Sequence, residues 1–172
     1  MTNTLFYQTT FNSPIGELTL CAKEDNLVGI WIKNQKYYAD SLKNCPVENR
    51  EDLKIFRDTK KWLTDYFKGK KKSPYELPLA PIGSGFRQLV WEELCKIPYG
   101  ETTTYGELSK TIARELGKDK MSAQAVGGAV GHNPISIIIP CHRVIGKNGQ
   151  LTGYAGGLEI KSKLLQLEKS KI

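Results

Sequence analysis

Residues 133–149 read NPISIIIPCHRVIGKNG and place Cys141 directly after an apolar run and a proline. Asn133 and Pro134 end any preceding helix, and the run ISIII at 135–139, with its four β-branched isoleucines, predicts a buried strand. The Asn-Gly pair at 148–149 predicts a tight turn. A cysteine at the end of such a strand would lie where a rigid element meets a loop, which is a common position for a reactive side chain.

His142 and Arg143 follow Cys141 directly in the sequence. An adjacent histidine can accept the thiol proton, either directly or through a water molecule, and an arginine adds positive potential. Both effects favour the thiolate, which is the reactive form of cysteine. Cys141 is therefore a candidate nucleophile, although a buried, inert cysteine beside a His-Arg pair fits these residues equally well.

Three helices are predicted upstream of this segment. Apolar residues at helical spacing predict one over residues 86–97, a second over 104–116, and a third over 122–132 with Ser122 as its N-cap. The last two, joined by the turn GKDK, have the outline of a helix-turn-helix. Many helical hairpins bind no DNA, so the outline alone does not establish DNA binding.

The third predicted helix carries very few large side chains. It reads SAQAVGGAVGH, and its glycine pair, Gly127 and Gly128, costs on the order of 2 kcal/mol relative to alanine. Two explanations are open. Either a neighbouring helix packs tightly against it, or another surface, such as a nucleic-acid groove, comes close to its backbone.

The first part of the chain has a different pattern. Residues 5–11, 16–24 and 26–33 predict an antiparallel meander of strands. Residues 53–67 predict a helix with Leu53, Phe56, Lys60, Leu63 and Phe67 on one face, widened by Trp62 and Tyr66. The proline-containing stretch 68–85 predicts an extended connection, and residues 158–169 predict a last helix with leucines facing the core.

These elements predict an α/β protein of the α+β kind with two domains. Residues 1–80 form the strand-rich N-terminal domain with its linker, and residues 81–172 form a helical C-terminal domain that carries Cys141.

Composition limits the function further. The chain of 172 residues has a formal net charge of +7, which favours a polyanionic partner, although solvated lysines in the run 68–72 account for part of this excess. No apolar run approaches the ~20 residues that span a bilayer, and the N-terminus lacks the layout of a signal peptide, so we expect a cytoplasmic protein. The irregular spacing of the four cysteines and the presence of two histidines predict reduced thiols, no metal site and no cofactor.

From Gly85 to Glu168 the chain resembles the methylated-DNA–protein-cysteine methyltransferases, also called O(6)-alkylguanine-DNA alkyltransferases. The resemblance lies in the PCHRV core at 140–144, in PYGETTTYGEL at 98–108, in AVGGAVGHNP at 125–134 and in TGYAGG at 152–157. It implies a ribonuclease-H-like N-terminal domain and a DNA-binding C-terminal domain of winged-helix type.

The resemblance also implies DNA repair by direct reversal. A family member flips O(6)-methylguanine out of duplex DNA and transfers the alkyl group irreversibly to its own cysteine, once per molecule. We therefore expect double-stranded DNA with an alkylated guanine as the partner, a monomeric protein, and Cys141 as the alkyl acceptor. The sequence leaves open whether O(4)-methylthymine and larger alkyl groups are also substrates.

Individual roles follow from the resemblance, position by position. His142 is implied as the base that reaches Cys141 through a water molecule, with Glu168 orienting it. Asn133 is implied to brace the turn that holds the cysteine, and the Tyr105 hydroxyl to approach N3 of the flipped guanine. The other implied contacts are Val144, Tyr154, Ala155 and Val130 for the substrate, and Gln124, Ala123, Ala125, Thr104 and Arg143 for DNA.

Gln124 departs from the family pattern. The helix over 122–132 corresponds to the family's recognition helix, which enters the minor groove, and its small side chains would permit a close approach. Family members usually have an arginine where Gln124 stands, and that arginine fills the space left by the flipped base. Glutamine has neither the charge nor the planar fork of arginine, so we expect a difference in base flipping and not in the chemistry.

Two other functions remain open. A lesion-recognition protein or a regulator would use the same helix-turn-helix without repair chemistry, but relatives that only bind DNA lack the acceptor cysteine. A cysteine hydrolase would use Cys141 and His142 to turn over an activated ester. The third predicted helix would then have no role.

Overall fold

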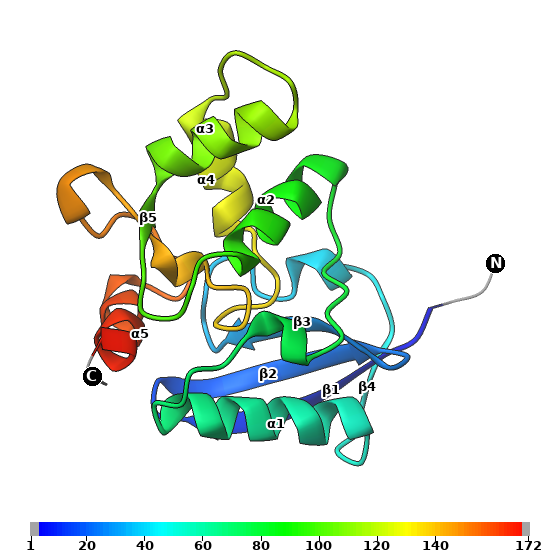
Figure 1. Ribbon diagram of the computed structural model, residues 1–172. Coiled ribbons are helices and arrows are strands. Elements are labelled where there is room, and N and C mark those ends of the chain that lie inside the picture. Colours follow the sequence, from blue (N-terminus) through cyan, green and yellow to red (C-terminus); the bar gives the residue numbers. More distant parts are fainter. Residues whose placement is uncertain (1–3, 170–172) are drawn as a thin grey trace.

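The N-terminal part is a sheet covered on one face by a helix, and the computed structural model describes the chain from residue 4 to residue 169 (Figure 1). Strands β1 (Phe6–Ser13), β2 (Gly16–Lys23) and β3 (Asn26–Ile32) form the predicted antiparallel meander. A short strand β4 (Val47–Asn49) pairs with β1 in parallel and gives the order β3-β2-β1-β4. Sequence reasoning missed β4 because all of its residues are exposed and show no alternation of apolar and polar side chains.

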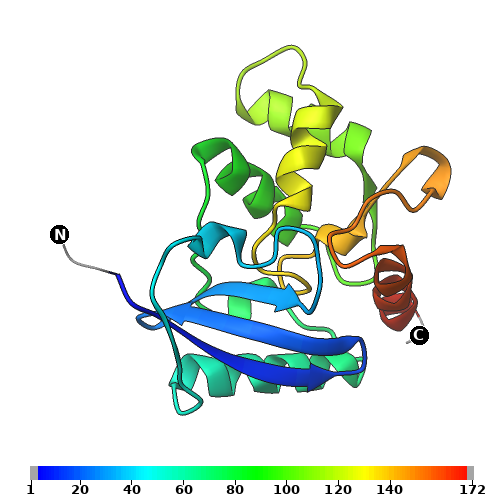
Figure 2. The same cartoon turned by 180° about the vertical axis from the view of Figure 1, so that it is seen from behind.

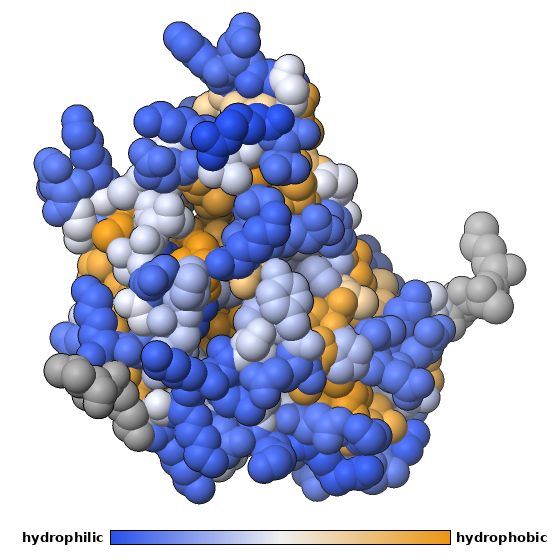
Figure 3. Space-filling view, viewed as in Figure 1, coloured by the Kyte–Doolittle hydropathy of each residue, from blue (hydrophilic) through white to orange (hydrophobic). Residues whose placement is uncertain are grey.

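Helix α1 (Lys54–Phe67) packs against the sheet, and Figure 3 shows that mostly hydrophilic residues cover its outer side. The buried face differs from the expected one by one position, because Thr59 and not Lys60 lies at its centre. The Thr59 hydroxyl donates to the Ile55 carbonyl at 2.7 Å, so no polar group of its side chain is left unpaired in the core. Trp62 and Tyr66, expected at the margin of the face, are both buried.

The connection between the two parts is extended, as predicted, apart from a single 3-10 turn, η2 (Pro74–Glu76). It runs along the free edge of β3, where Leu27 N donates to Pro78 O at 2.9 Å and Ala80 N donates to Leu27 O at 2.8 Å. Within the lysine run, Lys70 pairs with Asp65 at 3.2 Å and Lys72 with Glu76 at 2.9 Å. Part of the run therefore holds the connection against the end of α1.

The C-terminal part contains three helices that pack on one another: α2 (Gly85–Cys95), α3 (Tyr105–Glu115) and α4 (Ala123–Gly131). The predicted cap is confirmed, because Ala125 N donates to the Ser122 hydroxyl at 3.2 Å. Helices α3 and α4 form the predicted helix-turn-helix. The last helix, α5 (Leu158–Lys169), has the predicted bounds.

Short elements complete this part of the chain. Strands β5 (Thr103–Thr104) and β6 (Val144–Ile145) pair in parallel, and two 3-10 turns, η3 (Cys141–Arg143) and η4 (Lys147–Gly149), flank β6. Asn148 and Gly149 both take positive φ angles, of 64° and 80°, as the predicted Asn-Gly turn requires. The expected mixed fold, with a strand-rich N-terminal domain and a helical C-terminal domain, is confirmed.

The predicted strand over residues 135–139 is wrong. All five residues are buried, but only Ile135 pairs with the sheet, through a single bridge to Ile30 on the edge of β3. Ile137 then takes a φ of 74°, a left-handed conformation that is strained for a β-branched residue, and the chain turns away from the sheet. The run is therefore apolar because this turn is buried on all sides, and not because it forms a strand.

The two parts share one hydrophobic core. It contains Leu18 and Tyr66 from the N-terminal part together with Ile135, Cys141 and Leu164 from the C-terminal part. Figure 2 shows the segment that follows β3, with the 3-10 turn η1 (Asp40–Leu42), lying between the sheet and the helices of the C-terminal part. No helix within residues 4–169 is long and apolar enough to span a membrane.

Candidate active site

A cavity of about 390 Å³ opens beside Cys141. Its lining brings together five residues that the sequence singled out: Tyr105, Val130, Cys141, Tyr154 and Ala155. The glycines of α4 and of the loop after η4 form much of the remaining wall, together with Lys36 and Tyr37 from the N-terminal part. A second cavity, of about 280 Å³, lies between the connection and α2, and none of the predicted site residues lines it.

Asn133 fixes the turn that carries Cys141. Its amide nitrogen donates to Ile139 O at 2.7 Å, and its amide oxygen accepts from Ile135 N at 3.0 Å. Cys141 N donates to the same Ile139 carbonyl at 2.8 Å. The cysteine thus begins η3 on a braced backbone, with only 6% of its surface exposed.

Burial raises the pKa of the Cys141 thiol above its ordinary value of 9.0, although a hydrogen bond to Asn133 and the charge of Lys161 act in the opposite direction. The thiol therefore keeps its proton at neutral pH until a base accepts it. Activation of the sulfur must come from a neighbouring proton acceptor.

His142 is fully buried, and its Nε2 lies 2.5 Å from Glu168 Oε2. Burial lowers the pKa of His142 below 6.5, and this outweighs the hydrogen bond and the charge of Glu168, which would raise it. A neutral imidazole that donates from Nε2 keeps a lone pair on Nδ1. Within the described part of the chain Nδ1 has no hydrogen-bond partner, so its lone pair is available to accept a proton.

Glu168 accepts four hydrogen bonds from three separate parts of the chain. Oε2 accepts from His142 Nε2 and, at 2.6 Å, from the Tyr66 hydroxyl. Oε1 accepts from Arg143 Nε at 2.7 Å and from Gly100 N at 3.2 Å. Burial alone would raise the pKa of Glu168, but the hydrogen bonds and charges of His142 and Arg143 lower it to about 2, so the carboxylate is ionised at neutral pH.

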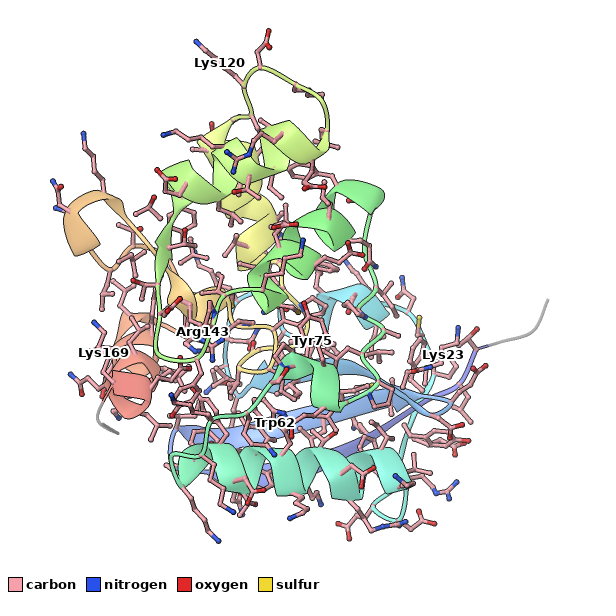
Figure 4. All side chains as sticks on the ribbon, in the orientation of Figure 1. Lys23, Trp62, Tyr75, Lys120, Arg143 and Lys169 are labelled. Atoms are coloured by element: carbon pink, nitrogen blue, oxygen red, sulfur yellow. The ribbon has the colours of Figure 1, made fainter. Side chains whose placement is uncertain are left out.

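The expected contact between Arg143 and DNA is corrected by the structure. Only 3% of the residue is exposed, and its guanidinium donates to Glu168 and, at 2.7 Å, to Ile97 O. Figure 4 shows it inside the molecule, far from Lys120 at the tip of the turn between α3 and α4. Arg143 thus serves to hold Glu168 and cannot reach a phosphate from this position.

Lys161 on α5 is a site residue that sequence reasoning missed. It is fully buried, and its Nζ donates to three carbonyls, those of Val144 at 2.6 Å, Thr152 at 3.1 Å and Gly153 at 3.1 Å. Its charge lowers the pKa of Cys141, the effect that the sequence had suggested for Arg143. One face of α5 contains residues 161, 164, 165 and 168. A lysine on the same face as core leucines was therefore the sequence signal that could have identified Lys161.

The remaining predicted substrate residues lie at different depths. The Tyr105 hydroxyl points to the loop after η4 and donates to Thr152 O at 3.2 Å. The Tyr154 hydroxyl is buried, and among the described residues it has no hydrogen-bond partner. Val144 is fully buried and is not among the residues that line the cavity, and Lys161 already donates to its carbonyl.

The start of α4 presents the predicted DNA-contacting residues to solvent. Ala123, Gln124 and Ala125 are exposed, and so is Gly128, one turn after Gln124. A Cβ atom added at Gly128 would meet no other atom within 4 Å. Tight packing within the protein therefore does not explain this glycine. Thr104 is half-buried, and its hydroxyl accepts from Glu107 N at 3.1 Å as the N-cap of α3.

Two family models match the chain. The ribonuclease-like domain of 6-O-methylguanine DNA methyltransferase matches residues 6–81, and the DNA binding domain of the same family matches residues 85–170.

Individual relatives agree with these matches over nearly the whole chain. A methylated-DNA–protein-cysteine methyltransferase of Methanosarcina acetivorans is 47% identical over 165 residues, which cover 95% of this chain and 99% of that protein. The protein of the same name from Haemophilus influenzae is 40% identical over 166 residues, covering 96% of this chain and 88% of that protein. The crystal structure of Mycobacterium tuberculosis OGT in complex with DNA is similar with a TM-score of 0.81 and 40% identity, over 96% of this chain and 93% of that chain.

Proposed function

The chain belongs to the 6-O-methylguanine DNA methyltransferase family, and from that premise we propose that it repairs DNA by transferring the alkyl group from O(6) of guanine to its own Cys141. The observation that carries the proposal is the position of this cysteine, which lies in the wall of a cavity and directly precedes a buried His142–Glu168 pair. The protein binds DNA, and the specific partner that we propose is a DNA duplex with one alkylated guanine.

In the proposed binding step, α4 approaches the minor groove with its exposed Ala123, Gln124 and Ala125, while Thr104 approaches the backbone from the start of α3. The target base leaves the stack at a cost of a few kcal/mol, which contacts in the pocket offset. The cavity beside Cys141 receives the base, with Val130, Tyr154 and Ala155 in contact with it. The Val144 backbone is proposed to read the exocyclic amine of the base.

In the proposed chemical step, a water molecule carries the proton of the Cys141 thiol to Nδ1 of His142. The sulfur attacks the alkyl carbon, an S–C bond forms as the C–O(6) bond breaks, and the electron pair of that bond stays on guanine. The Tyr105 hydroxyl donates to N3 and spreads this charge, which would contribute about 3 kcal/mol if it acts like other oxyanion donors. Glu168 stabilises the new imidazolium, and Lys161 favours the thiolate.

The product is a thioether, which has no easy leaving group, so each molecule acts once. We also propose a domain boundary at residues 80–81 and a cytoplasmic protein that acts as a monomer. The lengths of the two family matches and the connection along β3 support the boundary. Asn133 is proposed to keep the acceptor turn in place throughout the reaction.

Intact mass measured after mixing the protein with a duplex that contains one O(6)-methylguanine tests the proposal. We expect the wild type to gain one methyl group and then to be inactive toward fresh substrate, and Cys141→Ala to gain nothing. DNA binding without a gain in mass would support a lesion-recognition protein instead. Repeated turnover of an activated ester would support a cysteine hydrolase.

A further inference from the structure

Tyr66 connects the N-terminal part of the protein to the residues around Cys141. It lies in α1, and its hydroxyl donates to Glu168 Oε2 at 2.6 Å, across 102 residues of sequence. Both side chains are buried, with 0% of Tyr66 and 3% of Glu168 exposed. The bond therefore has no competition from bulk solvent.

The geometry of the carboxylate gives this bond a specific task. Oε1 of Glu168 is held by Arg143 and Gly100, whereas Oε2 accepts from Tyr66 and from His142. Within the described chain, Tyr66 is therefore the one group besides the His142 imidazole that holds Oε2 in place. If the hydroxyl were absent, the carboxylate could rotate about its contacts to Oε1 and weaken its bond to His142.

The tyrosine ring is held as firmly as its hydroxyl. Trp62 stacks on it with the ring centroids 5.4 Å apart, while Phe67 and Tyr99 contact it edge-on at 5.2 Å and 6.1 Å. Burial, followed by the charge and the hydrogen bond of Glu168, raises the pKa of Tyr66 well above 10. The hydroxyl consequently remains a donor at neutral pH.

We propose that Tyr66 is a positioning residue for alkyl transfer, which keeps Glu168 Oε2 aligned with His142 Nε2 while the histidine accepts the thiol proton. The inference rests on the proposed function. A carboxylate that is already aligned needs no reorganisation when the imidazolium forms, and such preorganisation accelerates a step in which charge develops. The strand-rich domain then contributes directly to the reaction, through one hydrogen bond from α1.

Tyr66→Phe tests the proposal, with Tyr99→Phe as the matched control. The Tyr99 hydroxyl is also buried, yet it has no hydrogen-bond partner among the described residues, and its ring contacts the ring of Tyr66. In single-turnover assays with methylated duplex, we expect Tyr66→Phe to lower the saturating rate constant about tenfold, the scale of one hydrogen bond to a charged group. The Kd for DNA should be unchanged, and Tyr99→Phe should match the wild type in both quantities.

Proton NMR of the His142 Nε2–H group supplies a readout that a general loss of stability would not change. We expect its resonance to shift and broaden in folded Tyr66→Phe and to keep its position in Tyr99→Phe. A wild-type rate, or a lower rate with an unchanged resonance, would overturn the proposal. If Tyr66→Phe does not fold, fluorotyrosine at position 66 preserves the ring and strengthens the donor; an unchanged resonance there would likewise overturn it.

The same assays separate the two hypotheses. A wild-type protein that gains no methyl group contradicts the proposed function itself. A wild type that gains the methyl group, beside a Tyr66→Phe variant of equal rate, contradicts only the role of Tyr66.

Discussion

His142 is kept uncharged at neutral pH by its burial. Its pKa in the folded protein lies below 6.5, whereas an unfolded chain has the ordinary value of 6.5. Between these two values, the unfolded state binds a proton that the folded state does not. Stability is therefore lost as the pH falls below 6.5, at a rate of up to about 1.4 kcal/mol per pH unit.

We predict that the free energy of unfolding decreases between pH 7 and pH 5 in urea titrations, and that His142→Gln makes this dependence shallower. Glu168 affects stability in a lower pH range, because its pKa falls from 4.5 to about 2 on folding. Its contribution to the free energy of unfolding disappears only as the pH drops through those values. His132, which is partly exposed, supplies the control through His132→Gln. Equal slopes for the wild type and His142→Gln would contradict this account.

Lys161 provides the second prediction at the residue scale. Lys161→Met removes a buried ammonium and leaves the carbonyls of Val144, Thr152 and Gly153 without their common donor. We expect a loss of about 2–4 kcal/mol in the free energy of unfolding, and slower alkyl transfer, because the charge that favours the thiolate is gone. Chemical denaturation and single-turnover kinetics measure the two effects.

The same helix offers a matched control for Lys161. Lys163 is exposed and pairs with Glu159 at 3.2 Å, so Lys163→Met should change stability by less than about 1 kcal/mol. If the two methionine variants were equally stable, the three carbonyl contacts would contribute nothing of note.

At the scale of secondary-structure elements, α4 combines low intrinsic helix stability with an exposed face. Gly128→Ala adds a Cβ atom that meets nothing in the protein, so we expect the variant to be more stable by up to about 1 kcal/mol. On DNA the same methyl group would lie between the helix and the groove, and we expect affinity for duplex DNA to fall. Thermal unfolding and fluorescence anisotropy measure these opposite changes.

Gly85 at the start of α2 is the control for this experiment, since an added Cβ there also meets no other atom within 4 Å. Gly85→Ala should leave DNA affinity unchanged. A Gly128→Ala variant that binds DNA as tightly as the wild type would indicate that α4 does not approach DNA closely.

Gln124, on the same exposed face, carries a separate prediction about base flipping. Arginine at this position would supply the charge and the planar fork that glutamine lacks. We expect Gln124→Arg to bind methylated duplex more tightly and to react faster at low DNA concentration, with the same rate constant once the base is in the pocket. The measurement is the dependence of the single-turnover rate on DNA concentration, and Gln124→Ala should shift it in the opposite direction.

The elements also indicate which features a sequence can reveal. Helices α3 and α4 were predictable because their apolar spacing and caps are local, as with Ser122. The run 135–139 misled because burial on every side gives the same composition to a strand and to a packed turn. What distinguishes them is that Ile135 forms a single bridge to the distant Ile30 and that the chain then turns away at Ile137.

At the scale of the whole molecule, the two parts are tied together by polar contacts as well as by a shared core. Ile30 N donates to Pro134 O at 2.9 Å, and Ser136 N donates back to Ile30 O at 3.1 Å. The Ser136 hydroxyl also donates to Gln35 at 3.3 Å. The sequence motif singled out Cys141 and His142, but it could not identify the contact of Tyr66 with Glu168 or the edge of β3, since neither lies near the motif in the chain.

We therefore expect the protein to unfold in one cooperative transition. Because the core spans both parts, calorimetric and van't Hoff enthalpies should agree. A core substitution in the sheet, such as Leu20→Ala, should lower the melting temperature without splitting the transition. Two resolved transitions, one for each part, would show that the shared core couples them only weakly.

The four donors around Glu168 have a consequence for synthesis on the ribosome. Glu168 follows His142 by 26 residues and Tyr66 by 102, so it emerges after every other member of its hydrogen-bonded cluster. A nascent chain therefore contains Cys141 and His142 before the carboxylate that pairs with His142 has been added. In the proposed mechanism, His142 acquires its carboxylate partner only after α5 has been synthesised and has docked.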